Sequence, residues 1–155
     1  MKDAGTLEVS NRQMTETHRP RRILQSIGAV LAGLLAIVIL SIATDQALHA
    51  TGVFPPFGQP MADALFLLAL AYRIVYGVAG GYITARLAPE RPMQHALAYG
   101  VVGLVISTAG AVTAWNAGPA FGPRWYALAV IAIALPCAWV GGKLRQMQMR
   151  ARADG

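Results

Sequence analysis

Charged residues are scarce in this chain of 155 residues. Only 13% of them are Asp, Glu, Lys or Arg, whereas 55% are hydrophobic. A soluble domain carries about 25% charged residues, and half of that share is too little to cover a surface that faces water. The composition therefore argues against a soluble domain. The length fits one folding unit of roughly 100–200 residues rather than a large multidomain enzyme.

Cysteine and catalytic motifs are also nearly lacking. The only cysteine is Cys137, so no intramolecular disulfide can form. The chain contains no phosphate-binding glycine loop followed by Lys-Ser or Lys-Thr, no HExxH, no GxSxG and no CxxC. Its seven acidic residues leave few candidates for acid–base catalysis. We therefore predict no catalytic residues and no cofactor, and a non-enzymatic role is favoured.

Long apolar runs are what the sequence does contain. Four of them, at about 23–44, 64–87, 96–115 and 125–144, reach the roughly 20 residues needed to cross the hydrocarbon core of a bilayer. None alternates polar and apolar residues at the period of a strand. The sequence predicts an all-α integral membrane bundle of four transmembrane helices over 23–144. A polar basic tail (1–22), expected to be mobile, precedes the bundle, and a basic tail (145–155) follows it.

The basic residues are distributed unevenly between the two ends of these spans. One end carries Lys2, Arg12, Arg19, Arg21, Arg22, Arg86, Arg91, Lys143, Arg145, Arg150 and Arg152, and the other carries only Arg124. Excess Lys and Arg mark the cytoplasmic side of a membrane, so both termini are predicted to be cytoplasmic. This topology and contact with anionic lipids explain the net charge of +6 without nucleic acid as a partner.

Small residues recur at every fourth position of each span. In lipid, helices associate by close backbone approach at such positions. The stripe in the first span is Gly28, Ala32 and Ala36. The predicted packing residues in the other spans are Gly77, Gly81, Ala85, Gly103, Ser107, Ala138 and Gly142. Similar Phe-Gly motifs at 57–60 and 121–123 also leave open two parallel helix-hairpin repeats.

One charged residue, Arg73, lies inside a predicted span. A central arginine costs about 2.5–3.5 kcal/mol on insertion scales, so it needs a partner or water. Tyr72 and Tyr76 flank it, and Asp45 and Asp63 are acidic candidates, although neither lies at its depth. Two interpretations stay open. Arg73 either lines a polar cavity that binds an anion or a lipid headgroup, or it hydrogen-bonds backbone carbonyls and fixes the packing.

Asp45 and His49 are four residues apart, a spacing that can begin a metal site. No Cys/His cluster completes such a site. A hydrogen-bonded or capping pair is therefore the favoured interpretation, and no metal is predicted, with Asp45 and His49 as the only candidate ligands.

Several runs resemble a group of small, uncharacterised bacterial membrane proteins with four helices. They are GVFPPFGQPM (52–61), the pattern YR…YG.AG.Y..ARLAP (72–89), RPM.HAL (91–97), PAFGP.WY.LA (119–129) and LPCAW.GG.L (135–144). The resemblance implies a location in the bacterial inner (cytoplasmic) membrane. It implies no mechanism and no site.

The favoured function is a non-enzymatic accessory or interaction subunit in the lipid bilayer, within a larger membrane complex or a homo-oligomer. The alternative is a small oligomeric transporter or channel with a polar site around Arg73. That alternative predicts a water-accessible cavity that reaches Arg73 from one side. A dry bundle in which Arg73 touches only carbonyls and aromatic rings would exclude it.

Overall fold

The computed structural model describes residues 3–115, 118 and 122–154, with side chains from residue 21 onward. Within these ranges the chain is all-α and has no strand. Its helices are α1 (Asp3–Ala50), α2 (Asp63–Leu87), α3 (Pro92–Ala114) and α4 (Arg124–Ala153). Each contains a segment long and apolar enough to cross a membrane. The predicted all-α architecture with four long apolar helices is therefore confirmed.

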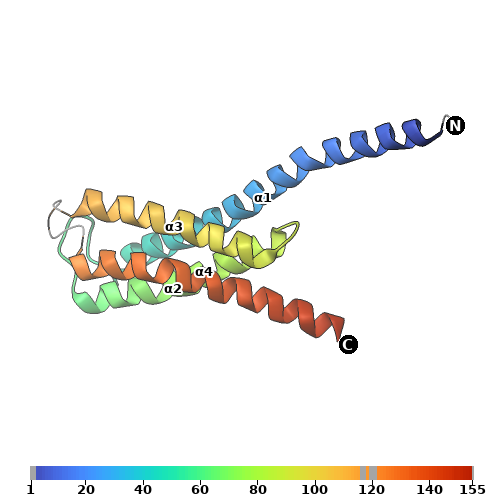
Figure 1. The fold of residues 1–155 in the computed structure, drawn as a ribbon. Coiled ribbons are helices and arrows are strands. Elements are labelled where there is room, and N and C mark those ends of the chain that lie inside the picture. The colour runs from blue at the N-terminus through green and yellow to red at the C-terminus, as the bar shows by residue number, and fades with distance from the viewer. Residues whose placement is uncertain (1–2, 116–117, 119–121, 155) are drawn as a thin grey trace.

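Successive helices run in opposite directions, so both termini lie at the same end (Figure 1). We call this the terminal end; it also holds the short connection between α2 and α3. The opposite end, which we call the loop end, holds the connections from α1 to α2 and from α3 to α4. The parallel helix-hairpin repeat stays a prediction.

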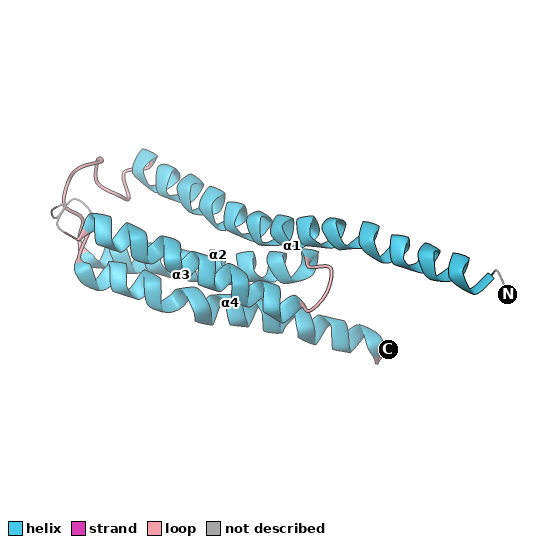
Figure 2. Cartoon of the chain, turned by 45° about the horizontal axis from the view of Figure 1, so that its top comes forward, coloured by secondary structure: helices cyan, strands magenta, loops and turns pink. Residues whose placement is uncertain are grey.

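The helices continue beyond the predicted spans. The backbone of the N-terminal tail is helical from Asp3 and projects past the other helices, where the sequence favoured a mobile tail (Figures 1 and 2). At the loop end α1 runs past Thr44 to Ala50. At the terminal end α4 continues to Ala153. Extending an existing helix avoids the cost of nucleation, so polar residues next to an apolar span readily join its helix.

A close backbone contact joins α2 and α4. A Cβ atom added to Gly141 would lie 2.4 Å from the carbonyl oxygen of Val78, and one added to Gly81 would lie 3.0 Å from the Cα of Ala138. The distance at Gly141 is too short for any side chain, and the distance at Gly81 would require its neighbour to shift. The two backbones therefore touch directly, which explains why small residues occupy this contact.

Helix α1 is held mainly by α2 and barely touches α4. Its small-residue contact is Gly33, where an added Cβ would lie 2.6 Å from the carbonyl oxygen of Gly80. Gly28 is exposed and has no described atom within 4 Å of such a Cβ, whereas Ala29 and Gly33 are buried, so the packing face of α1 is shifted by one residue from the predicted stripe. Small residues occupy several adjacent turns of α1, and their spacing alone could not select the buried face.

The predicted packing residues divide into two groups. Gly77, Gly81, Ala85, Ala138 and Gly142 are buried at helix contacts. Gly103 and Ser107 are not: both are partly exposed and line a cavity, and a Cβ on Gly103 would have no described atom within 4 Å. Their prediction as packing residues is corrected, because the closest small-residue contacts of α3 with α2 and α4 lie nearer the terminal end, around Ala96, Tyr99 and Gly100.

The α2–α4 contact can be tested with Gly141→Ala. We expect the free energy of unfolding to fall by about 1–3 kcal/mol, since the added methyl group must push two backbones apart. Gly110→Ala on α3 is the matched control, because the new methyl group there meets no described atom within 4 Å. Thermal unfolding of both variants in mild detergent measures the difference. A Gly141→Ala protein as stable as the Gly110→Ala protein would contradict the backbone contact.

Candidate functional site

The candidate site is an ion pair between α1 and α2. Arg73 Nη2 lies 2.8 Å from Asp45 Oδ2. Arg73 Nη1 donates to the hydroxyl of Tyr126 on α4 and, at 3.4 Å, to the hydroxyl of Tyr72. The Tyr72 hydroxyl in turn donates to Asp45 Oδ1. One polar network therefore joins three of the four helices.

The pair forms because α1 is longer than the predicted first span. Asp45 lies about 7–8 Å inside the end of α1 at Ala50, at 1.5 Å per residue. Arg73 lies about 15 Å inside the start of α2, and its long side chain can extend toward the loop end. The arginine side chain is long enough to bridge the difference in depth between the two charges.

Two aromatic rings shield the guanidinium. Its Cζ atom lies 5.4 Å from the ring centroid of Tyr72 and 5.7 Å from that of Tyr126. The side chains of Arg73 and Asp45 are 25% and 28% exposed, so the pair is neither dry nor freely solvated. Reduced contact with water strengthens the attraction between the charges and makes separating them costly.

Two other residues predicted for this site have different partners. Tyr76 forms a hydrogen bond of 2.9 Å with the Thr44 hydroxyl, which ties α1 to α2 one turn away from Tyr72. Asp63 accepts a hydrogen bond from Trp125 Nε1 at 3.3 Å and does not reach Arg73. The structure therefore brings together Arg73, Asp45 and Tyr72. It adds Tyr126, which was not among the predicted site residues.

His49 organises the loop between α1 and α2. Its Nδ1 atom lies 2.7 Å from the carbonyl oxygen of Pro55, and its ring lies 3.9 Å from the ring centroid of Phe57. Positive φ angles at Gly52 and Gly58 allow the chain to turn back over the bundle. The Nδ1 atom of His49 is therefore engaged with the loop rather than with Asp45. The described residues contain no group of three His, Cys, Asp or Glu that could hold a metal.

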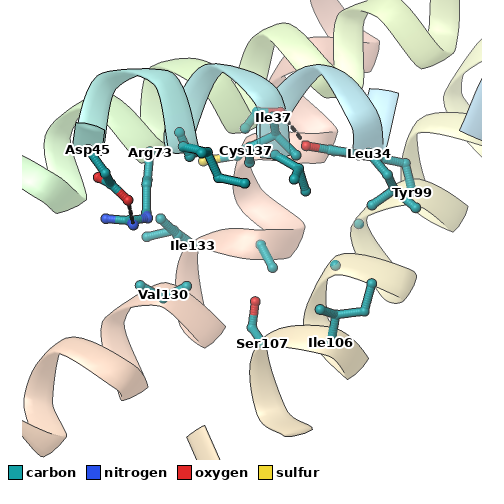
Figure 3. A pocket seen from close by; sticks show the side chains of 17 residues that line it. Leu34, Ile37, Asp45, Arg73, Tyr99, Ile106, Ser107, Val130, Ile133 and Cys137 are labelled. Carbon is teal, nitrogen blue, oxygen red and sulfur yellow. Dashed lines mark hydrogen bonds and ion pairs between the residues drawn. The ribbon is translucent and has the colours of Figure 1, made fainter. Parts of the chain in front are cut away.

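Two cavities meet at the Asp45–Arg73 pair. The loop cavity, of about 180 Å³, lies under the α1–α2 loop at the loop end; its lining includes Phe54, Phe57, Phe66, Ala69 and Tyr126. The helix cavity, of about 310 Å³, lies within the bundle and is lined by all four helices. Asp45 and Arg73 line both cavities, and in Figure 3 they stand at one side of the helix cavity.

The helix cavity is apolar along most of its wall. Leu34, Ile37, Val130 and Ile133 are among the residues that line it, and Ser107 points its hydroxyl toward the space (Figure 3). The exposed residues of the lining are Val38 and Ile42 on α1, at 49% and 55%, and Ile106 on α3, at 58%. The cavity therefore opens sideways between α1 and α3, which contact each other less extensively than α1 contacts α2.

The cavity ends about halfway along the bundle. At this point the hydroxyl of Tyr99 donates to the carbonyl oxygen of Gly77 at 3.2 Å, and Cys137 packs 3.1 Å from the position of a Cβ on Gly77. Beyond it, toward the terminal end, α2 and α4 are in backbone contact at Gly81 and Gly141. Arg73 is thus accessible from the loop end, while close packing fills the terminal half.

The strength of the ion pair can be measured with a double-mutant cycle. We expect Asp45→Asn and Arg73→Gln to be coupled by about 0.5–3 kcal/mol in the free energy of unfolding, because each removes the other's partner. The control cycle pairs Arg73→Gln with Asp63→Asn, a carboxylate at the same end that accepts a hydrogen bond from Trp125. Reversible unfolding in mixed micelles supplies the four values of each cycle. Additive effects of Asp45→Asn and Arg73→Gln would refute the pair.

Comparison of the chain with protein-family models, curated proteins and solved structures returned no match. The resemblance to small bacterial membrane proteins therefore stays a prediction, and the site is interpreted from its own geometry.

Proposed function

We propose that this chain is a multi-pass protein of a bacterial inner membrane that binds a small molecule at the Asp45–Arg73 pair and transports it. The observation that carries the proposal is the position of this pair where two cavities meet. A polar site reached from one end is what the transport alternative requires, and Arg73 has a carboxylate and hydroxyl groups as partners rather than carbonyls alone.

Membrane insertion is supported by the surface of the helices. Large apolar side chains such as Leu35 (59%), Ile39 (62%), Val75 (62%) and Val105 (60%) are exposed along them. Contiguous apolar surface of this extent is unfavourable in water and suits contact with lipid. With the distribution of Lys and Arg, we propose that the terminal end faces the cytoplasm and the loop end the opposite side.

A carrier fits the geometry better than an open channel. A channel needs a continuous polar path, whereas the terminal half of the described bundle is closed by backbone contact between α2 and α4. A carrier opens to one side at a time, and the arrangement here corresponds to access from the loop end. Helix α1, which is held mainly by α2, is the element best placed to move when the Asp45–Arg73 pair opens.

The accessory role in a larger complex stays a prediction. Co-purification from native membranes in mild detergent, followed by mass spectrometry, would identify a stable partner.

Cysteine accessibility tests the transport proposal. In a Cys137→Ala background, we expect Met61→Cys, which is partly exposed and lines the loop cavity, to react with a charged, membrane-impermeant thiol reagent added to intact cells. Leu67→Cys is the control: it lies on the exposed face of α2, where lipid disfavours the reactive thiolate. Equal labelling of the two variants, or none at Met61→Cys, would contradict a water-accessible route to Arg73.

The same background tests orientation. Gln59→Cys in the loop should be labelled in intact cells, and Gln148→Cys near the end of α4 only after the membrane is permeabilised. The opposite pattern would overturn the proposed topology.

A further inference from the structure

We infer that the helix cavity holds the hydrocarbon tail of a single-chain amphiphile whose anionic head, a carboxylate or a phosphate, binds Arg73. The inference rests on the proposed function and names the class of molecule that this site takes. It follows from the wall of the cavity, the unused hydrogen-bond donors at its polar end, and the position of its mouth.

The shape and lining of the cavity suit one hydrocarbon chain. Along α1 it extends from Asp45 to Leu34, roughly 16 Å at 1.5 Å per residue. Its volume of about 310 Å³ is at the lower limit of the usual range of ligand pockets, roughly 300–1,000 Å³. An apolar space of this kind is occupied more favourably by an apolar group than by water. The cavity is therefore matched to one chain rather than to the two chains of a phospholipid.

At the polar end of the helix cavity, Arg73 has hydrogen-bond donors that its described partners do not use. The Arg73 guanidinium has more N–H groups than its three hydrogen bonds to Asp45, Tyr126 and Tyr72 use. Both oxygens of Asp45 already accept a hydrogen bond. The hydroxyl groups of Ser41 and Ser107, which also line the cavity, have no partner within the described part of the chain. Unused donors favour a ligand that brings acceptors, and an anionic oxygen group is the strongest such acceptor.

The mouth of the cavity favours a molecule that comes from the bilayer. It opens between α1 and α3, where Val38, Ile42 and Ile106 are exposed, and these residues are all apolar. A water-soluble anion would instead reach Arg73 through the loop cavity. A molecule that enters sideways would place its tail in the apolar cavity and its head beside the donors of Arg73.

Substitution of Gly103 is a specific way to block the part of the cavity that the tail would occupy. It lines the cavity, and a side chain there would project into space that no described atom occupies. Gly110 is the matched control on the same helix, because it also has room for a side chain but does not line the cavity. A series of Gly103→Ala and Gly103→Leu fills the cavity stepwise without touching Asp45 or Arg73.

The test measures binding of radiolabelled hexadecanoate to the purified protein in lipid nanodiscs. We expect saturable binding that hexadecyl phosphate displaces, whereas acetate, inorganic phosphate and hexadecanol displace it at least about tenfold less well. Gly103→Leu should weaken binding at least tenfold, Gly103→Ala less, and Gly110→Leu not at all. Arg73→Gln should remove the preference for hexadecanoate over hexadecanol. The more effective of the two anionic probes identifies the head as carboxylate or phosphate.

Three outcomes would overturn the inference. Binding that survives Gly103→Leu in folded protein would place the tail elsewhere, and a graded loss at Gly103→Ala separates blocking from misfolding. Acetate or phosphate as potent as the long-chain probes would leave an anion site without a tail. If hexadecanoate does not bind while Met61→Cys is labelled from the loop end, the ligand class fails and the proposed transport site stands. If neither is observed, both fail.

Discussion

The Asp45–Arg73 ion pair determines how the loop half of this molecule is arranged. A charged guanidinium among apolar helices is unfavourable unless it finds an opposite charge and hydrogen-bond acceptors. Asp45, Tyr72 and Tyr126 supply these from three helices. The network therefore ties α1 to α2 and α4 at a level where α1 and α4 barely touch, and leaves space on both sides of itself. The two cavities follow from this arrangement.

The two halves of the bundle are held by different forces. In the terminal half, glycine allows direct contact between backbones, as at Gly81 and Gly141, and dispersion forces between close-packed atoms dominate. In the loop half, the polar network around Arg73 links α1, α2 and α4 beside the two cavities. A rigid half next to a less tightly packed half is the arrangement that allows a binding site to open without unfolding the protein.

The proposed ligand would contact both the apolar cavity and the polar network around Arg73. Its tail would replace the empty apolar volume beside Gly103, and its head would use the donors that Arg73 keeps after pairing with Asp45. A ligand that competes with Asp45 for Arg73 would also weaken the link between α1 and α2. Binding and the movement of α1 are then coupled through the same guanidinium, which is a physical basis for transport.

The sequence by itself determined the class of structure: the number of helices, their approximate positions, the common end of the two termini and the unusual character of Arg73. These follow from apolar length and charge, which are local properties. Only the tertiary structure decided that Asp45 rather than Asp63 meets Arg73, because this depends on where α1 ends and how far the arginine stem reaches. Tyr126 and the cavity-lining role of Gly103 depend on which faces of the helices meet. Small residues are so frequent here that their spacing fits several faces, and only the packed bundle selects one.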